Sequence, residues 1–492
     1  MKKYICIHGH FYQPPRENPW LEAITHQESA YPFHDWSERI HAECYAPNTQ
    51  ARILDEKGLV AERVNNYSSI SFDFGPTLLS WMESKAPDTY QAVLDADKIS
   101  QEKFSGHGSA MAQCYSHMIM PLANSKDKYT QVYWGIRDFE FRFKRLPEGM
   151  WLPETAVDLE TLQIMADLGI RFTILAPHQA GRPSDHGRQN GQLDINQPYS
   201  VSLGAGKSIN IFFYNGALSQ SMAFENILQD GKCFAEKLMH TDNNGGPQLL
   251  SVATDGETYG HHHKFGDMAL AFALKYIENQ MDARLTNFAE YLEKFPPEGE
   301  IEIIEKTSWS CAHGVERWSS HCGCETGGHH GWNQKWRAPL RQALDWLRGR
   351  SNSIFEEAGK DLFKDPWAAR NRYIDVRINR YDRDTFWAEQ CQSKLEESEK
   401  VVMLKLLELQ SNLMFMYTSC GWFFNDISGI ETEQILLYAG KAIQLAEELS
   451  GEVLEPHFLE LLELAESNIP EKGNGSQIYI NVTKKARMDF QV

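Results

Sequence analysis

The sequence predicts an α/β protein in which a parallel sheet or barrel is followed by a bundle of helices. Over about the first three hundred residues, short strand-like runs alternate with amphipathic helical patterns, which is typical of parallel strands joined by helices. After about residue 335 helical periodicity dominates. We therefore expect a barrel domain with long insertion loops over residues 1–335, a helical domain over 336–468 and a linker or tail over 469–492.

The expected strands of the first domain are short apolar runs at residues 4–8, 170–176, 209–214, 249–253 and 300–305. Residues 155–168 carry apolar side chains at helical intervals, and Gly169 follows as a helix C-cap. The stretch 177–208 interrupts the alternation with Gly, Asn, Gln and Pro. It predicts a long surface loop, of the kind that often forms a lid or a substrate-binding element.

The second domain is predicted from its helices. Periodic segments fall at residues 338–348, 353–363, 366–378, 400–417, 431–449 and 456–466. Asp365 followed by Pro366 favours a helix start, because a capping acid then precedes a proline at the first helical position. The tail opens with the linker-like sequence 473–476, and a strand-like run at 478–482 suggests the start of a further domain.

Composition narrows the class of protein. The 492 residues are 42% apolar, enough for a sizeable core. A formal net charge of −19 argues against nucleic-acid binding, which needs a basic surface. We find neither a signal peptide nor the roughly 18 apolar residues of a membrane span. Nine scattered cysteines do not suggest a disulfide framework. We expect a cytoplasmic protein with reduced thiols, no membrane or nucleic-acid partner, and an undetermined oligomeric state.

Glu154 is the first candidate catalytic residue. It follows Trp151-Leu152-Pro153 and precedes the helix expected from residue 155, so it should lie at the mouth of a barrel, where active sites are built. The positive end of that helix would help to keep the carboxylate ionised, as a nucleophile requires. On this stretch alone, an ordinary glutamate at a helix start explains the pattern at least as well.

Asp255 is the second candidate. The apolar run at 249–253 leads into it, and Gly256 and Glu257 follow. A carboxyl group at a strand end with apolar walls tends to have a raised pKa, which suits a general acid. A plain Asp-Gly turn is the alternative. Together with Glu154, this residue would supply the two acids that cleavage of a glycosidic bond requires.

Several further residues are candidates for binding a substrate. His8 and His10 alternate at the end of the first strand, so both rings can face one pocket and bind hydroxyl groups or zinc. Gln13 follows with an amide. Glu257 and His261 come shortly after Asp255, although a histidine run is more often a solvated loop.

Aromatic side chains are a further indication. Sugar rings stack their C–H faces on aromatic planes, and Trp151 and Trp422 are the best placed of the 13 tryptophans. Most tryptophans of a large protein are core residues, and that interpretation stays open for both.

A cysteine-rich segment carries Cys311, Cys322 and Cys324 among several histidines. Zinc sites usually combine units with two to five residues between the ligands, and those spacings are absent here. We therefore expect a structural or substrate-lining segment, no metal and no cofactor, and leave the role of these cysteines open.

Taken together, these motifs resemble glycoside hydrolase family 57, which includes α-amylases, 4-α-glucanotransferases and branching enzymes. His8, His10, Gln13 and Pro14 match its opening motif. The stretch 151–154 matches the region of the catalytic nucleophile, which assigns that role to Glu154, and 255–257 matches the region of the general acid/base, which assigns that role to Asp255. The resemblance covers about residues 1 to 430 and implies a distorted (β/α)7 barrel followed by a helical domain.

The leading hypothesis is a retaining glycosidase or transglycosylase that acts on α-linked glucans or oligosaccharides by double displacement. One alternative is a zinc-dependent carbohydrate hydrolase, similar to a deacetylase or mannosidase, with His8 and His10 as ligands. Another is a barrel that binds carbohydrate without turnover. The sugar, the linkage and the balance between hydrolysis and transfer are not determined by the sequence.

Overall fold

The computed structural model describes residues 3–183, 188–189, 192–240, 248–327, 329–378, 383–392 and 396–488. The chain folds into two compact units. The first, which we call the barrel unit, comprises Met1–Gln13, His26–Cys114 and Phe139–Glu305. The second, which we call the helical unit, comprises Pro14–Thr25, Tyr115–Asp138 and Lys306–Val492. Each unit therefore combines segments that are far apart in the sequence.

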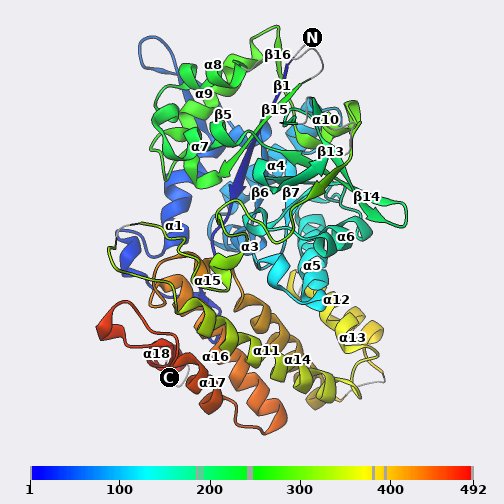
Figure 1. The fold of residues 1–492 in the computed structure, drawn as a ribbon, viewed down its shortest axis with the longest axis vertical. Coiled ribbons are helices and arrows are strands. Elements are labelled where there is room, and N and C mark those ends of the chain that lie inside the picture. The colour runs from blue at the N-terminus through cyan, green and yellow to red at the C-terminus, as the bar shows by residue number, and fades with distance from the viewer. Residues whose placement is uncertain are drawn as a thin grey trace. The chain divides into compact units, whose positions relative to one another are not determined.

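The barrel unit is built on a parallel sheet. Its strands are β1 (Lys3–Phe11), β6 (Ser71–Phe74), β7 (Ala110–Gln113), β8 (Met150–Trp151), β15 (Leu249–Asp255) and β16 (Ala283–Leu285). The hydrogen-bonded order is β15-β1-β6-β7-β8, β16 also pairs with β1, and every pair is parallel. Figure 1 shows β15 running beside β1. The apolar run of β15 is buried up to Thr254, as expected for an interior parallel strand.

Two further strands extend this wall. A parallel bridge from Gly149 to Phe172 leads from the start of β8 to β9 (Phe172–Leu175). Strand β9 pairs in parallel with β14 (Lys207–Phe213). The backbone N–H of Asn215, just after β14, donates to the carbonyl of Ser251 in β15 at 2.7 Å. Among the described residues, the five strands of the main path plus β9 and β14 thus form the wall of a distorted seven-stranded barrel, which confirms the predicted fold class.

Helices connect the barrel strands. They are α1 (Trp36–Ile40), α2 (Ala46–Thr49), α3 (Pro76–Lys85), α4 (Pro87–Lys103), α6 (Leu159–Asp167), α7 (Gly216–Phe224), α8 (Gly231–Met239), α9 (Gly266–Glu278) and α10 (Phe288–Lys294), with a π-helix, η2 (His41–Tyr45), between α1 and α2. The apolar side chains that predicted α9, among them Leu270, Leu274 and Ile277, are buried. Gly169 follows α6 with φ +91°, the left-handed backbone expected of a C-cap glycine.

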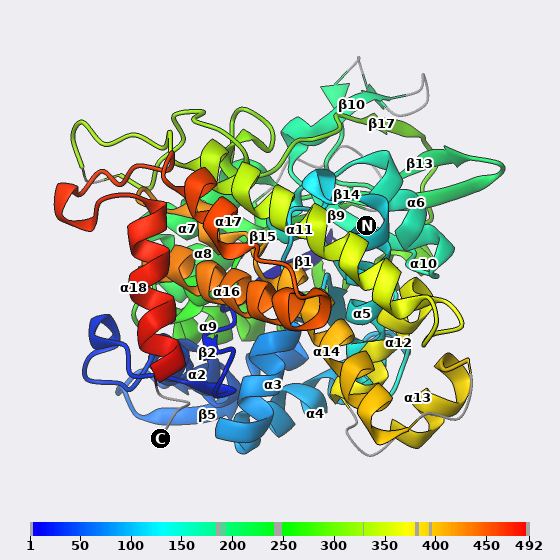
Figure 2. The ribbon, with the colours of Figure 1, turned by 90° about the horizontal axis from the view of Figure 1, so that it is seen from below.

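The helical unit is dominated by long helices of the C-terminal half. They are α11 (Arg337–Gly359), α12 (Pro366–Ile378), α13 (Arg383–Gln390), α14 (Glu397–Phe415), α15 (Cys420–Phe423), α16 (Ile430–Ser450), α17 (Glu455–Leu462) and α18 (Gly475–Met488). Helix α16 packs against α11, α14, α15 and α18, and Figure 2 shows α11, α14 and α16 side by side. The predicted start of α12 is confirmed, because Asp365 accepts the backbone N–H groups of Trp367 and Ala368 at 2.8 and 3.0 Å.

Helix α5 (Ser125–Phe143) belongs to both units, and the division between them falls after Asp138. The helical unit also contains a short antiparallel pair, β2 (Glu17–Asn18) with β3 (Ala23–Ile24).

The strand predicted at 478–482 is wrong, because these residues lie within α18. Asn474 caps the helix by accepting the backbone N–H of Gln477 at 3.1 Å, so the supposed linker is a helix start. Tyr479 and Thr483, one turn apart, both face Gly440 of α16, where a Cβ would lie 2.8 Å from a Thr483 methyl group. This close packing overrides the strand preference of the isoleucines and valine.

Two other predictions are corrected. The segments 338–348 and 353–363 were expected as separate helices, but α11 runs unbroken from Arg337 to Gly359. The loop expected at 177–208 contains strand structure, because β10 (Ala180–Pro183) pairs with β17 (Ile301–Ile303) and β13 (Tyr199–Gly204) forms a hairpin with β14. Residues 184–187 and 190–191 of that stretch lie outside the described residues.

Within the described ranges, no helix combines the length and the apolar character that crossing a bilayer requires.

Candidate active site

The candidate active site lies at the carboxyl ends of the barrel strands. The register places His10 of β1 beside both Asp255 of β15 and Asp73 of β6. Two strands further along, Gln113 ends β7 opposite Trp151 of β8. Parallel strands bring their carboxyl ends to one edge of a barrel, and active sites form there. We call the set His8, His10, Asp73, Glu154 and Asp255 the strand-edge site.

Glu154 lies in a strained turn just after β8. A short 3-10 turn spans Pro153–Thr155, within which Glu154 has φ 57° and ψ 21°, and Thr155 also has a positive φ. A left-handed backbone at a residue other than glycine costs of order 1–3 kcal/mol and is common at active sites. The backbone at Glu154 is therefore strained, and this strain costs stability at the candidate nucleophile.

The helix that was expected to begin at Thr155 begins instead at Leu159, capped by Asp158. The argument that the start of this helix keeps Glu154 ionised is therefore wrong. What fixes the turn is Gln179. Its Oε1 accepts from the Thr155 hydroxyl and its Nε2 donates to the Thr155 carbonyl, both at 2.8 Å. The buried amide of Gln179, and not a helix end, is thus what fixes the backbone around Glu154.

Asp255 combines solvent access with a raised pKa. Its side chain is exposed at the end of β15, but the dense protein around it penalises the charged form. This desolvation, opposed by the charge of His10, raises the pKa of Asp255 to about 7, and Glu257, Glu154 and Asp73 add to the rise. The carboxyl group therefore still holds its proton at mildly acidic pH, as a general acid must. Glu154 is among the charges that raise this pKa, so it lies near enough to Asp255 to act on it through its charge.

His8 and His10 share one buried carboxylate. Asp73 contacts Nε2 of His8 at 3.0 Å and Nδ1 of His10 at 2.8 Å, and all three side chains are buried. Burial opposes the charged ring of His10, but the Asp73 carboxylate outweighs it and, with Asp255 and Glu257, raises the pKa of His10 to about 9. Burial lowers the pKa of His8. The network thus pairs one imidazolium with one carboxylate and holds a neutral second ring.

Trp151 packs against the rings of both histidines. Its ring stacks on His8 at 4.9 Å and on His10 at 5.1 Å between centroids, and it is fully buried. The sequence predicted that Trp151 stacks on a sugar. In the structure its ring instead stacks on two histidines of the site. Direct stacking on a sugar stays a prediction.

Glu257 and Gln13 are held by protein groups beside the site. Oε1 of Glu257 accepts from the backbone N–H of Tyr12 at 3.3 Å and from the hydroxyl of Tyr45. Burial raises the pKa of Glu257. Gln13 donates from Nε2 to the carbonyl of Tyr12 at 3.0 Å. The two bonds of Glu257 tie the chain after β1 to η2. Contact of Glu257 or Gln13 with sugar stays a prediction.

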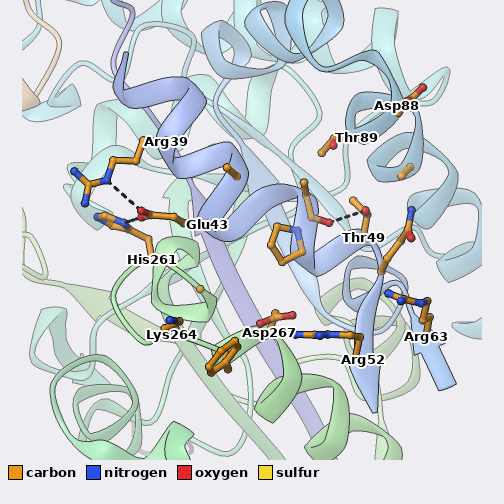
Figure 3. Close-up of a pocket in the computed structure, with 17 residues that line it drawn as sticks. Arg39, Glu43, Thr49, Arg52, Arg63, Asp88, Thr89, His261, Lys264 and Asp267 are labelled. Carbon is orange, nitrogen blue, oxygen red and sulfur yellow. Dashed lines mark hydrogen bonds and ion pairs between the residues drawn. The ribbon is translucent and has the colours of Figure 1, made fainter. Parts of the chain in front are cut away.

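His261 lines a separate pocket of the barrel unit. This pocket has a volume of about 930 Å³, and its lining includes Arg39, Glu43, Arg52 and Asp267 but no member of the strand-edge site. Figure 3 shows Glu43 between His261 and Arg39, joined to both. That His261 binds substrate stays a prediction; its ring contacts Glu43, an acid of this pocket.

Trp422 lies in the core of the helical unit. Its ring is fully buried, stacks on Tyr417 at 6.1 Å between centroids and faces the Arg341 guanidinium at 4.5 Å. These contacts give it a packing role within its unit. Its predicted role as a sugar platform stays a prediction.

Sequence reasoning missed three residues of the strand ends. Asp73 lies inside the apolar strand Ser71–Phe74, where a buried acid between two phenylalanines was an available signal. Tyr214 follows β14, and burial together with the nearby Asp255 carboxylate raises its pKa.

Gln113, the third missed residue, carries a buried amide. Neither its Oε1 nor its Nε2 has a hydrogen-bond partner among the described residues. A Cβ at Gly75 would lie 3.4 Å from Oε1, so the amide sits beside the turn after β6. A buried amide without partners is rare and calls for an explanation, such as a ligand that completes it.

Two groups of side chains bring potential metal ligands within 4.8 Å of one another, in the part of the chain that the structure describes. They are Cys311, His313, Cys322 and Cys324, and the group His34, Asp35 and Glu38. Neither group includes a residue of the strand-edge site.

Comparisons with known proteins agree with this architecture. The family model of glycosyl hydrolase family 57 matches residues 7–304, and a domain of unknown function (DUF3536) matches residues 332–492. No curated protein sequence matches the chain significantly.

Among solved structures, an exo-type maltose-forming amylase from Pyrococcus sp. ST04 is similar, with 15% identity over 99% of this chain and 92% of that chain and a TM-score of 0.67. A branching enzyme of the same family from Pyrococcus horikoshii has 14% identity over 100% and 96% of the two chains, with a TM-score of 0.56. An α-amylase from Thermotoga maritima has 12% identity over 97% and 99%, with a TM-score of 0.55. At these identities the likeness shows the fold.

Proposed function

The chain belongs to glycosyl hydrolase family 57, and we propose that it cleaves or transfers α-linked glucans by a retaining, double-displacement mechanism. The observation that carries this proposal is the pair of acids at one edge of the barrel. Asp255 has its pKa raised to about 7, with Glu154 among the charges that raise it. A carboxyl group that still holds its proton near neutral pH, beside a second acid, is what this chemistry needs.

In the first step Glu154 attacks the anomeric carbon. Its electron pair forms the bond from carboxylate oxygen to sugar, while the glycosidic bond breaks and its electrons pass to the leaving oxygen. Asp255 donates its proton to that oxygen. The positive charge of His10 favours the carboxylate that Asp255 then becomes.

The second step reverses the roles. Once Glu154 is esterified it has no charge, so one cause of the raised pKa of Asp255 disappears. Asp255 can then remove a proton from water or from a sugar hydroxyl group, whose oxygen attacks the anomeric carbon and frees Glu154. Water gives hydrolysis and a sugar acceptor gives transfer.

We also propose that Gln113 binds a sugar hydroxyl group. Its amide offers one acceptor and two donors, has no partner among the described residues and ends a strand next to β8. Sugar hydroxyls donate and accept, so a glucose unit at the strand edge would satisfy both amide atoms.

The test compares two variants on two substrates. On a maltooligosaccharide, Glu154→Gln should lower kcat by about 10⁴-fold or more and Asp255→Asn by about 10²–10⁴-fold. On a maltosyl fluoride, whose leaving group needs no proton, the first step of Asp255→Asn should recover, and Glu154→Gln should stay inactive. NMR should show the first product with the anomeric configuration of the substrate.

Other outcomes would reject the mechanism. Undiminished turnover by Glu154→Gln would remove the nucleophile. A wild-type protein that binds glucan but forms no covalent adduct with a glycosyl fluoride would be a binding protein without turnover. Stoichiometric zinc that is lost in His8→Ala and His10→Ala, with activity lost in parallel, would favour a zinc-dependent hydrolase.

A further inference from the structure

A cluster of thiols and one imidazole lies in the helical unit, in the segment between β17 and α11. Cys311, His313, Cys322 and Cys324 each offer one ligand atom, and all four atoms lie within 4.8 Å of one another. We call these four residues the cysteine cluster. Apart from a short 3-10 turn at Glu316–Trp318, the described part of this segment has no helix or strand. Secondary structure therefore does not explain why the four side chains meet.

The three distances known between ligand atoms of the cluster match those of a tetrahedral site. Sγ of Cys311 lies 3.9 Å from Sγ of Cys322 and 3.7 Å from Sγ of Cys324. Sγ of Cys324 lies 3.5 Å from Nδ1 of His313. Ligands at about 2.3 Å (sulphur) and 2.0–2.1 Å (nitrogen) from one tetrahedral zinc ion would be about 3.8 Å apart for two sulphurs and about 3.6 Å apart for sulphur and nitrogen. All three observed distances agree with this geometry, whereas a disulfide needs about 2.0 Å.

Backbone N–H groups point at the sulphurs. The amides of His313 and Arg317 donate to Sγ of Cys311, and the amide of Cys324 donates to Sγ of Cys322 at 3.5 Å. Donors of this kind stabilise thiolates and orient them toward a metal. The turn Cys322-Gly323-Cys324 depends on Gly323, whose φ of +84° lets both thiols face one point.

Two buried arginines border the cluster. Arg337 is fully buried and donates from Nη1 to the carbonyl of Cys324 at 3.2 Å. Arg317 is also buried, and its guanidinium lies 4.2 Å from the ring centre of Phe423. Buried cations need a compensating negative charge. Three thiolates around one divalent ion carry a net charge of −1, which offsets one of these two cations, whereas four neutral side chains offset neither.

We propose that Cys311, His313, Cys322 and Cys324 bind a single structural zinc ion. Three thiolates and one imidazole are a common structural zinc set, and four protein ligands leave no open position for catalysis. The other potential group, His34, Asp35 and Glu38, is unlike it. There His34 is exposed, and Asp35 is already the N-cap of α1.

The sequence led us to expect no metal because the spacings are unusual. One residue separates Cys311 from His313, and one separates Cys322 from Cys324, where zinc motifs usually have two to five. A single intervening residue is enough here because Gly323 turns the chain between the two thiols.

The test is the metal content of the purified full-length chain, measured by inductively coupled plasma mass spectrometry. We expect about one zinc per chain in the wild type. Cys324→Ser and His313→Ala should lower the zinc affinity at least about tenfold, whereas His313→Cys should keep the ion, because four cysteines also bind zinc. Cys233→Ser, which changes an exposed cysteine of the barrel unit, is the matched control and should keep the wild-type content.

Cobalt substitution gives a second readout on folded wild-type protein, so the proposal stays testable even if a variant does not fold. We expect a thiolate-to-cobalt charge-transfer band and the visible spectrum of a tetrahedral ion. Wild-type protein that binds neither zinc nor cobalt would overturn the proposal. So would stoichiometric iron, or a disulfide between two of the three cysteines. The proposal does not rest on the catalytic mechanism, since its readout is metal content and not turnover.

Discussion

The strand-edge site and the cysteine cluster are both dense groups of ionisable side chains, but they are organised differently. In the strand-edge site the register of β1 and β6 sets His10 opposite Asp73, and the carboxylate reaches both histidines within 3.0 Å. In the cysteine cluster Sγ of Cys324 lies 3.5 Å from Nδ1 of His313, and Sγ of Cys311 lies 3.7 and 3.9 Å from the other two sulphurs. Thiols are weak donors and acceptors. The strand ladder brings a carboxylate between the two histidines, so that site balances its charges internally, whereas the cysteine cluster has no such partner among its four side chains, and the proposed zinc ion would supply it.

Replacing Asp73 with asparagine should break the strand-edge site most severely. Removing one partner of a buried pair leaves an uncompensated charge and typically costs about 3–5 kcal/mol. Urea denaturation of wild type and Asp73→Asn measures the loss. Asp95→Asn is the control, because this half-exposed acid pairs with Lys98 on the surface of α4, and it should change stability by less than about 1 kcal/mol.

The same variant should alter the pH dependence of stability. The pKa of His10 is raised from 6.5 to about 9, so its contribution, of order 3 kcal/mol, is fully present below pH 6.5 and is lost as the pH rises through 9. The difference in unfolding free energy between wild type and Asp73→Asn should therefore become smaller between pH 6.5 and 9. A constant gap would show that Asp73 does not hold the charge of His10.

Removing zinc should destabilise the protein through the cysteine cluster and leave the strand-edge site unaffected. A ligand held at a hundredfold excess over its Kd stabilises the folded state by about 2.7 kcal/mol. Denaturation of the wild type with and without a chelator should show a loss of this size. The loss should vanish in Cys324→Ser and persist in Asp73→Asn. A chelator effect that Asp73→Asn abolishes, but Cys324→Ser does not, would place the ion at the strand edge.

The pH profile of catalysis tests the strand-edge site under working conditions. Asp255 must hold its proton to act as the acid, and its pKa is raised from 3.8 to about 7. On a natural glycoside, kcat/KM should be constant just below pH 7 and fall about tenfold per unit above it. With a glycosyl fluoride the alkaline decline should weaken, because that leaving group needs no proton. An equal decline for both substrates would contradict the assignment of Asp255.

The sequence could predict the features that local patterns encode, but not those that depend on contacts between distant segments. The fold class and strands β1, β14 and β15 were predictable because long apolar runs and their alternation with helices depend on local patterns. Strands β6, β7, β8 and β16 were missed, because they are only four, four, two and three residues long. Glu154 and Asp255 were found by motif. The strained turn at Glu154 was not, because it is fixed by Gln179, which lies 24 residues after Thr155 in the sequence. Asp73 had a local signal, an acid between two phenylalanines, but its pairing with His10 depends on the register between β1 and β6, which no local pattern encodes.

The smallest expected effect concerns Gln113. Its buried amide has no hydrogen-bond partner among the described residues, so Gln113→Leu should raise stability by about 1 kcal/mol. The same change should lower kcat/KM on a maltooligosaccharide about tenfold, through KM more than kcat, because one sugar contact is lost. Thr161→Val is the matched control. It also removes a buried polar group without a partner in the described ranges, here a hydroxyl, but from α6 and not from a strand end. It should raise stability and leave kinetics unchanged, since a ligand explains an unpaired polar group only where a ligand can reach it. If Gln113→Leu gains stability without losing substrate affinity, the amide belongs to the barrel core and not to the strand-edge site.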